Sequence, residues 1–305
     1  MTIIQLEYFL AVANYGSFSA AAERCFVSQP SLSMQISNLE DELGATLLDR
    51  NNKPIIPTEA GQIVLEQAKE AIASFYSVKE KMHNLKGKLT GKLRLGVIPT
   101  ISPFLMPKFV PEFMKRCPKV TLDIRDMFTA DIIDALSRDM IDIAILSGGY
   151  QIKIHETKLF NDRLYAYVSP RNPLFGRKSI HTEDIDMEQL LILSEGNCLR
   201  NQTLKLCKAT KDKIKSSYNF ANCSLETLMH MVDASSAITI IPEMAIDLIP
   251  ENKYNQIKPF SNTNAHRKIS MAVGHTYVKE AIVNAVKDSM MAVSEGYALS
   301  NFLRN

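Results

Sequence analysis

The stretch FSAAAERCFVSQPSLSMQISNLEDELG, residues 18–44, carries the pattern that decides the fold of the N-terminal part of this chain. An alanine-rich segment ends near Cys25, and Ser28 then stands where a hydroxyl can cap a new helix, with Pro30 tolerated in its first turn. The new helix is expected to end at Gly44. Its apolar residues recur at helical spacing and share one face: Leu32, Ile36, Leu39 and Leu43. Two helices joined this tightly predict a helix-turn-helix.

The flanking segments extend this motif to a winged helix-turn-helix over residues 1–58. Upstream, a further helix is expected to end at Gly16, because Leu6, Phe9, Leu10 and Ala13 recur at helical spacing before it. Downstream, the turn Asn51-Asn52-Lys53 separates two short apolar runs and predicts a small hairpin. A hairpin in this position makes the wing.

The second helix of the motif presents side chains that can reach base edges and phosphates in the major groove. The same face could instead be an ordinary solvated helix surface. Residues 1–58 hold three basic and six acidic side chains, a formal charge of −3 that is unusual for a DNA binder. Affinity would then depend on helix N-termini and on two copies binding together. The candidate DNA-contacting residues are Ser28, Gln29, Pro30, Ser31, Ser33, Gln35 and, in the wing, Arg50.

The sequence of residues 59–90 predicts a linker helix that also serves for dimerisation. The apolar residues follow alternating steps of four and three, which is the spacing of a coiled-coil seam. The stripe could pack against the chain's own N-terminal domain, but the period of 3.5 favours a second copy of the chain. Such a dimer would present two winged helices to a pseudo-palindromic site. The seam comprises Val64, Ala68, Ala71, Phe75, Val78, Met82, Leu85 and Leu89.

Residues 91–305 predict an α/β regulatory domain. Apolar runs such as Leu93–Ile98 alternate with helical patterns, which indicates a mainly parallel sheet. Two such halves would resemble a periplasmic-binding-protein fold, with a crevice between them as the default ligand site. The predicted boundaries are subdomain I, about 91–161 and 267–305, and subdomain II, about 162–266.

Cys198 and Cys207 flank a segment, residues 199–206, that reads as one short helix. A rise of about 1.5 Å per residue puts the two positions roughly 13 Å apart, whereas a disulfide needs Cα atoms within about 7 Å. The pair can therefore bridge only if the helix unwinds, which suits a switch better than a permanent crosslink. The helix N-terminus and Arg200 favour a reactive thiolate at Cys198, and Glu195 opposes it. Both cysteines could also be small apolar residues of a packed core.

Several of these motifs resemble one known family. The runs Phe18–Ala22, Val27–Ser33 and Thr58–Gly61 look like the winged helix-turn-helix of LysR-type transcriptional regulators. The order Gly196, Cys198, Leu199, Arg200, Gln202, Cys207 is similar to the sensor segment of the peroxide-responsive members of that family. The resemblance implies that Ser28–Ser37 forms most of the recognition helix and that Arg50 contacts DNA.

The same resemblance implies a redox role for the cysteines. Cys198 would be the peroxidatic residue, oxidised to a sulfenic acid, and Cys207 the resolving residue that closes a disulfide. Asn197 and Asn201 stand where the usual pattern has histidine and aspartate; asparagine can hydrogen-bond peroxide but cannot exchange a proton at neutral pH. The residues implied to hold peroxide are Thr100, Thr129, Asn197, Asn201 and Arg267.

Composition sets the broad class. The chain has 305 residues, a net charge of +2 and five cysteines. An odd number of scattered cysteines suits a reducing cytoplasm. Neither a signal peptide nor a membrane-length apolar run is recognisable, and no metal-ligand spacing, nucleotide loop or hydrolase triad points to a metal or a cofactor.

Three functions are weighed. The preferred hypothesis is a cytoplasmic, non-enzymatic regulator of oxidative-stress genes that senses hydrogen peroxide through a reversible Cys198–Cys207 disulfide. One alternative keeps the regulator but lets a small organic effector bind between the subdomains. Another is a thiol peroxidase, although an enzyme has no need of a winged helix and a heptad seam. The expected partners are double-stranded DNA, RNA polymerase, a thiol reductant, and further copies of the chain in a homodimer that assembles to a homotetramer.

Overall fold

The computed structural model describes residues 1–305 with the exception of 85–88, 149–154, 209–222, 275–279 and 295–305. The chain divides into two compact units. One is built mainly from Met1–Leu89, and the other mainly from Thr90–Gly274 together with Ile282 and the residues after it. None of the described helices combines the length and the apolar character needed to cross a membrane.

The N-terminal unit contains the predicted helix-turn-helix, and its helix ends are set by local chemistry. Ser17 and Ser28 accept backbone hydrogen bonds as N-caps, while Gly16 (φ 62°) and Gly44 (φ 65°) end their helices in the left-handed region that glycine adopts without strain. These caps confirm the predicted boundaries. The three helices are α1 (Ile3–Tyr15), α2 (Phe18–Cys25) and α3 (Gln29–Leu43).

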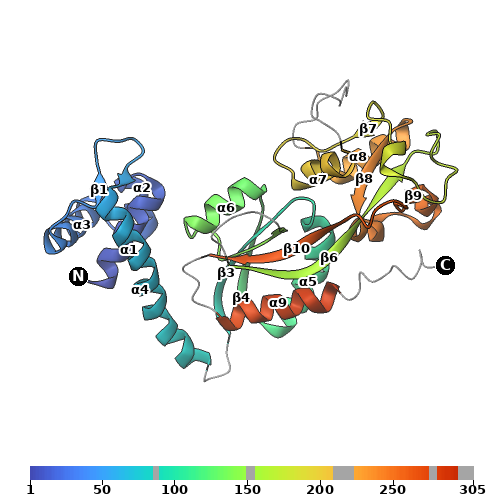
Figure 1. Ribbon diagram of the computed structural model, residues 1–305. Helices are drawn as coiled ribbons and strands as arrows, with labels where there is room; N and C mark the ends of the chain where they lie inside the picture. The colour runs from blue at the N-terminus through green and yellow to red at the C-terminus, as the bar shows by residue number, and fades with distance from the viewer. Residues whose placement is uncertain (85–88, 149–154, 209–222, 275–279, 295–305) are drawn as a thin grey trace. The chain divides into compact units, whose positions relative to one another are not determined.

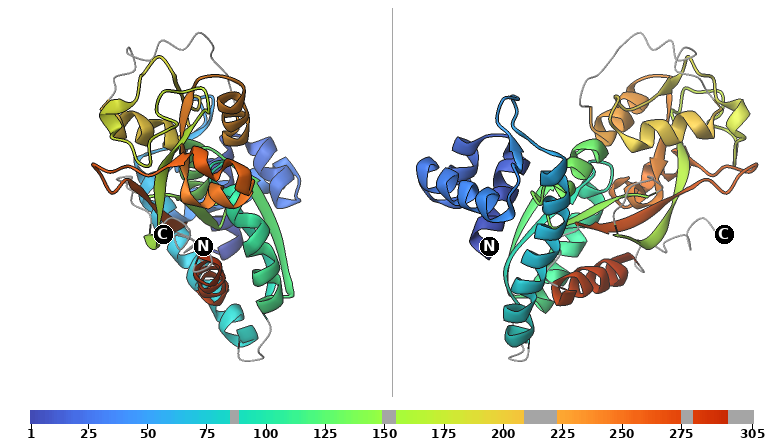
Figure 2. Two further views of the ribbon diagram at one scale, coloured as in Figure 1. Left: turned by 90° about the vertical axis from the view of Figure 1, so that its right-hand side faces the viewer. Right: turned by 60° about the vertical axis from the view of Figure 1, so that its left-hand side comes forward.

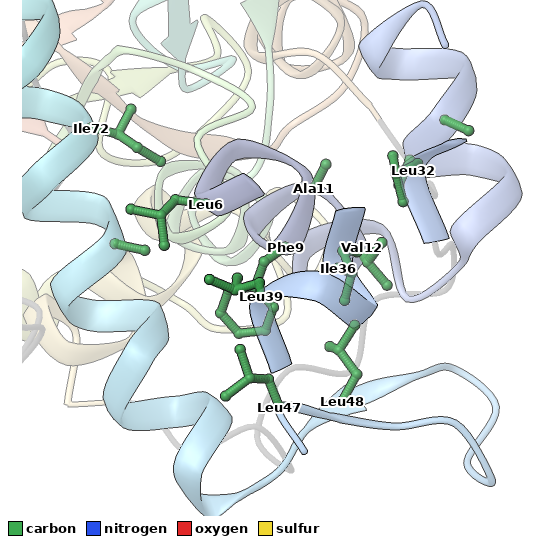
Figure 3. Close-up of a cluster of buried hydrophobic side chains, with 13 residues drawn as sticks. Leu6, Phe9, Ala11, Val12, Leu32, Ile36, Leu39, Leu47, Leu48 and Ile72 are labelled. Carbon is green, nitrogen blue, oxygen red and sulfur yellow. The ribbon is translucent and has the colours of Figure 1, made fainter. Parts of the chain in front are cut away.

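The wing and the helix core are joined through one hydrophobic cluster. Strands β1 (Leu48–Asp49) and β2 (Ile56–Pro57) pair antiparallel and close the wing. In Figure 3, Phe9 from α1, Leu39 from α3 and Leu47 from the start of the wing point toward one another. Each of these three side chains is fully buried. Burial of such side chains contributes about 1.5–3 kcal/mol each and fixes the wing against the recognition helix.

Helix α4 (Glu59–Asn84) divides the predicted seam into two parts. Ala68 is buried in the core of the N-terminal unit, next to Ile72, so the intramolecular alternative accounts for this part of the stripe. Phe75 and Val78, further along, are 47% and 63% exposed. Exposed apolar residues at heptad spacing suit a partner helix, and the dimer stays a prediction. Leu85 lies outside the described residues.

The regulatory unit is built on an eight-stranded sheet of order β4-β3-β5-β10-β6-β8-β7, with β9 paired to β6 (Figure 1). The strands are β3 (Thr90–Val97), β4 (Lys119–Asp126), β5 (Ile143–Ser147), β6 (His155–Val168), β7 (Leu190–Leu191), β8 (Ile238–Pro242), β9 (Ile257–Lys258) and β10 (His266–Val273). The helices are α5 (Ser102–Arg116), α6 (Thr129–Ser137), α7 (Cys198–Leu206), α8 (Leu225–Ala234) and α9 (Glu280–Ser294).

The sheet is mixed, whereas the sequence predicts a mainly parallel one. β3 pairs parallel with β4 and β5, and β7 with β8, but β6 and β10 make only antiparallel pairs. Both are long strands that run through the middle of the unit, as the views in Figure 2 also show. Alternation of strands and helices does not reveal that two strands run back across a sheet, and this is the reason for the error.

Candidate functional site

Helix α7 places Cys198 at its first position, immediately after a tight turn. Gly196 adopts a φ of 92°, and a Cβ atom there would lie 3.4 Å from the Phe128 ring, so glycine suits both the conformation and the close approach. Asn197 is buried and turns its amide back onto the carbonyl and hydroxyl oxygens of Ser194. The Cys198 side chain is therefore presented inside the domain, where only 4% of the residue is exposed.

A chain of polar contacts leads to the Cys198 sulfur. Arg267 Nη1 donates to Thr100 Oγ1 at 2.9 Å and Nη2 donates to the Thr100 carbonyl at 2.9 Å. The Thr100 hydroxyl lies 3.9 Å from Cys198 Sγ. Because this hydroxyl oxygen accepts from Arg267, its own hydrogen can point to the sulfur. The arrangement can stabilise negative charge on the sulfur or on a small molecule beside it.

Asp162 anchors the other side of the guanidinium. Arg267 Nε donates to Asp162 Oδ2 at 2.8 Å, and the two residues are directly opposite in the β6–β10 register. Their side chains are 0% and 2% exposed. Burial raises the pKa of Asp162, and the charge of Arg267 and the backbone N–H of Met244 oppose that rise. A buried pair of this kind fixes the position of the arginine more than it adds stability.

Two further side chains, Thr129 and Gln202, carry buried polar atoms without a hydrogen-bond partner among the described residues. Thr129, the first residue of α6, is 5% exposed, and its hydroxyl has no hydrogen-bond partner among the described residues. Gln202 Nε2 donates to the Ser147 hydroxyl at 2.7 Å, which ties α7 to the end of β5. The Gln202 Oε1 atom is buried and likewise unpartnered within the described ranges. An unpaired buried acceptor or hydroxyl is costly, so these atoms suit a small polar ligand or a water molecule.

Cys207 lies at the other end of the helix, as its C-terminal cap. Both Cys198 and Cys207 are free thiols, and the helix between them spans about 13 Å at the usual rise per residue. Burial raises the pKa of Cys207 to about 11, so at neutral pH it is a protonated thiol. Direct bonding is out of reach while α7 is intact.

The structure brings some of the predicted peroxide residues together and separates one. Thr100 and Arg267 are joined by hydrogen bonds beside Cys198, whereas Asn201 is exposed to solvent. Sequence reasoning missed Asp162 and Ser147. Asp162 is one charged residue in the run Asn161-Asp162-Arg163, and the sequence has no signal for which of the three is buried.

The candidate DNA-contacting residues lie on α3 and at the wing. Gln29 is exposed and its amide oxygen accepts from Ser19 Oγ at 2.9 Å, which leaves the amide donors for another acceptor. Arg50 is paired with Glu40 at 2.8 Å and stacks 5.2 Å over the Phe18 ring. The remaining candidates are Ser28 and Pro30, which are exposed, and Ser31, Ser33 and Gln35, which are half-buried.

Two exposed apolar residues of this region were not predicted. Met34, in the second turn of α3, is 57% exposed, and Phe26, which caps α2 before the turn, is 90% exposed. The sequence-based choice of polar side chains overlooked them. As for metals, no group of three His, Cys, Asp or Glu side chains converges in the described part of the chain.

Comparison with known proteins shows which class the fold and these sites define. Residues 3–62 match the bacterial regulatory helix-turn-helix protein family of the lysR type, and residues 86–293 match the LysR substrate binding domain. The chain belongs to the LysR family of bacterial regulatory proteins.

Within this family the chain is similar to hydrogen peroxide-inducible genes activators. It is 31% identical to the hydrogen peroxide-inducible genes activator of Haemophilus influenzae. The match covers 97% of this chain and 99% of that protein. It is 34% identical to the DNA-binding transcriptional dual regulator OxyR of Escherichia coli K12, with 83% of this chain and 82% of that protein covered.

Solved structures give the same result for the fold. A full-length OxyR mutant from Pseudomonas aeruginosa superimposes with a TM-score of 0.77 at 28% identity, covering 95% of this chain and 94% of the other. A hydrogen peroxide-bound OxyR mutant from Corynebacterium glutamicum gives 0.64 at 25% identity, with 99% and 95% covered.

Proposed function

We propose that this chain is a DNA-binding transcriptional regulator that senses hydrogen peroxide through Cys198 and Cys207 and controls oxidative-stress genes in the cytoplasm. The observation that carries the proposal is the contact chain from Asp162 through Arg267 and Thr100 to the buried Cys198 sulfur. Residues 1–58 would bind DNA, 59–90 would link and dimerise, and 91–305 would sense. The names of the similar proteins from Haemophilus influenzae and Escherichia coli support the same conclusion.

The first step is oxidation of Cys198. Its thiolate attacks one peroxide oxygen, the O–O bond breaks, and the leaving hydroxide takes a proton to become water; Cys198 is left as a sulfenic acid. The Thr100 hydroxyl, 3.9 Å from the Cys198 sulfur, and the Arg267 guanidinium behind it would stabilise the charge on the leaving oxygen. The buried hydroxyl of Thr129 and the amide of Asn197 are further candidate ligands. Asn201, being exposed, would join them only after α7 rearranges.

The second step is closure of the disulfide. The Cys207 sulfur attacks the sulfenic sulfur, and a second water leaves as the S–S bond forms. Because the intact helix holds the two positions about 13 Å apart, α7 must unwind first. Unwinding breaks the Gln202–Ser147 hydrogen bond and exposes Cys207. A local redox event can thus shift a two-state element that sets how the DNA-binding heads are spaced in a dimer or tetramer. A thiol reductant would restore the starting state, and RNA polymerase would respond to the bound regulator.

The test is DNA footprinting of the full-length chain, reduced and after stoichiometric hydrogen peroxide. We expect the wild type and Cys223→Ser, which removes an unrelated thiol, to change their footprint on oxidation, and Cys198→Ser to keep the reduced footprint. A footprint that changes equally in Cys198→Ser would refute the redox switch. A footprint that ignores peroxide but shifts with a small organic molecule would favour an effector bound between the subdomains instead.

A further inference from the structure

The helix-turn-helix and wing have few cationic side chains that are free to bind phosphates. Residues 1–58 have a formal charge of −3, and Arg50 is already engaged by Glu40 and the Phe18 ring. Three of the polar residues on α3 are half-buried. Besides the exposed Gln29 amide, sequence-selective binding therefore needs other groups on this helix that contact base edges.

The side chain that projects from the middle of α3 is apolar. Met34 is 57% exposed, and it shares its helix face with Pro30, four residues earlier, and Asn38, four residues later, both of which are exposed. Buried Leu32 and Ile36 occupy the opposite face. Met34 thus points away from the core of the domain and toward whatever the recognition helix meets.

Phe26 adds a second exposed apolar group at the entrance to the same helix. It adopts a left-handed conformation (φ 56°), which costs a side-chain-bearing residue about 1–2 kcal/mol, and the residue is 90% exposed. Packing of the Phe26 side chain inside the unit therefore does not offset the cost of this conformation. Only one residue separates Phe26 from Ser28, the N-cap of α3, so Phe26 lies close to the N-terminal end of that helix.

We propose that Met34 and Phe26 form an apolar reading surface, and that Met34 contacts the 5-methyl group of a thymine in the major groove. Thymine is the base that presents an apolar group there, and apolar side chains recognise it by contact. The inference rests on the proposed DNA-binding function and assigns a base preference to it. A polarizable, flexible thioether fits against a methyl group without needing a fixed hydrogen-bond geometry.

The experiment uses the reduced full-length chain and a duplex that it selects from a randomised library. Each thymine of the duplex is replaced in turn by deoxyuridine, which removes the methyl group and leaves base pairing intact. Affinities are compared for the wild type, Met34→Ala, and Leu248→Ala, a matched control that truncates a 56% exposed leucine in the regulatory unit.

We expect the wild type and Leu248→Ala to lose about fourfold in affinity at one thymine of each half-site, the ratio that corresponds to about 0.8 kcal/mol for one methyl-sized group. Met34→Ala should bind the duplex more weakly and be indifferent to that substitution. Phe26→Asn, which suits the left-handed conformation, should keep or raise the melting temperature while DNA affinity falls.

The proposal is overturned if the wild type ignores every deoxyuridine substitution, or if Met34→Ala loses affinity on methyl removal as the wild type does. In both cases the wild type still binds its selected duplex, so DNA binding itself stands. If the wild type selects no sequence at all, both the reading surface and the proposed DNA-binding function fail.

Discussion

Variants of the buried pair Asp162–Arg267 should change the free energy of unfolding and the oxidation rate of Cys198 by different amounts. Arg267→Met leaves the Asp162 carboxylate without its counter-charge in a site that is 2% exposed, and Asp162→Leu does the reverse. Each single change is expected to lower the free energy of unfolding by about 3–5 kcal/mol. The double variant removes both charges, so mainly the two hydrogen bonds of Arg267 to Thr100 are lost, at about 1 kcal/mol each. We expect a total loss of about 2 kcal/mol.

The assay is urea unfolding of the reduced full-length chain, followed by the rate at which peroxide blocks Cys198 from alkylation. The double variant should fold yet oxidise about 100-fold more slowly, because the donor that polarises Thr100 is absent. Arg177→Met, which breaks an exposed 2.7 Å ion pair with Asp184, should change stability by less than about 1 kcal/mol and leave the rate unaltered. Additive losses in the double variant would refute the coupling, and a wild-type oxidation rate would refute the role of Arg267 at the sulfur.

Four further outcomes follow from single residues. Closure of the disulfide after Cys198 is oxidised should speed up as the pH rises from about 7 to about 8.5, because only the Cys207 thiolate attacks and the unwound segment exposes a thiol of ordinary pKa; a flat stopped-flow profile would contradict this. Burial raises the pKa of Cys207 to about 11 in the reduced fold. The stability contributed by the buried thiol is therefore fully present below the ordinary cysteine pKa of about 8.5 and is lost as the pH rises through about 11. Cys207→Ser should abolish this pH dependence in melting curves. Gln202→Leu leaves the buried Ser147 hydroxyl unpaired, at a cost of about 1–3 kcal/mol, so amide exchange in α7 should accelerate by about tenfold. Unchanged exchange would show that the Gln202–Ser147 hydrogen bond does not hold α7 in place. In Gly61→Ala the new Cβ would lie 2.0 Å from a backbone carbonyl oxygen, so the free energy of unfolding of the N-terminal unit should fall by more than about 2 kcal/mol. Gly44→Ala, where space is open, should lower it by about 1 kcal/mol. Equal melting temperatures for the two variants would refute the role of close packing at Gly61.

The helix-turn-helix could be read from the sequence because its determinants are local. Ser28 accepts from a backbone N–H within its own turn, and Gly16 and Gly44 adopt the conformations that their residue type favours. Apolar spacing identified Leu32, Ile36 and Leu39 as buried. The exposure of Met34 was not foreseen, because residue type suggested polar contacts and only the helix phase reveals which side chain projects.

The sensor site could be predicted only in part because its contacts are long-range. Arg267 and Asp162 are 105 positions apart and meet only when β6 and β10 pair antiparallel, a pairing that the alternation of strands and helices does not reveal. The resemblance to LysR-type regulators suggested Thr100 and Arg267, and the geometry supplies their anchor. The tie between Gln202 and Ser147 likewise depends on packing of α7 against the end of β5.

In the proposed switch, peroxide oxidises Cys198, and the helix between Cys198 and Cys207 unwinds so that the two can form a disulfide. Peptide mapping of the full-length chain after brief exposure to stoichiometric hydrogen peroxide tests it directly. We expect a Cys198–Cys207 crosslinked peptide that reductant removes, together with loss of amide protection across residues 199–206. Free thiols at both positions, or oxidation that stops at Cys198 with α7 still protected, would contradict it.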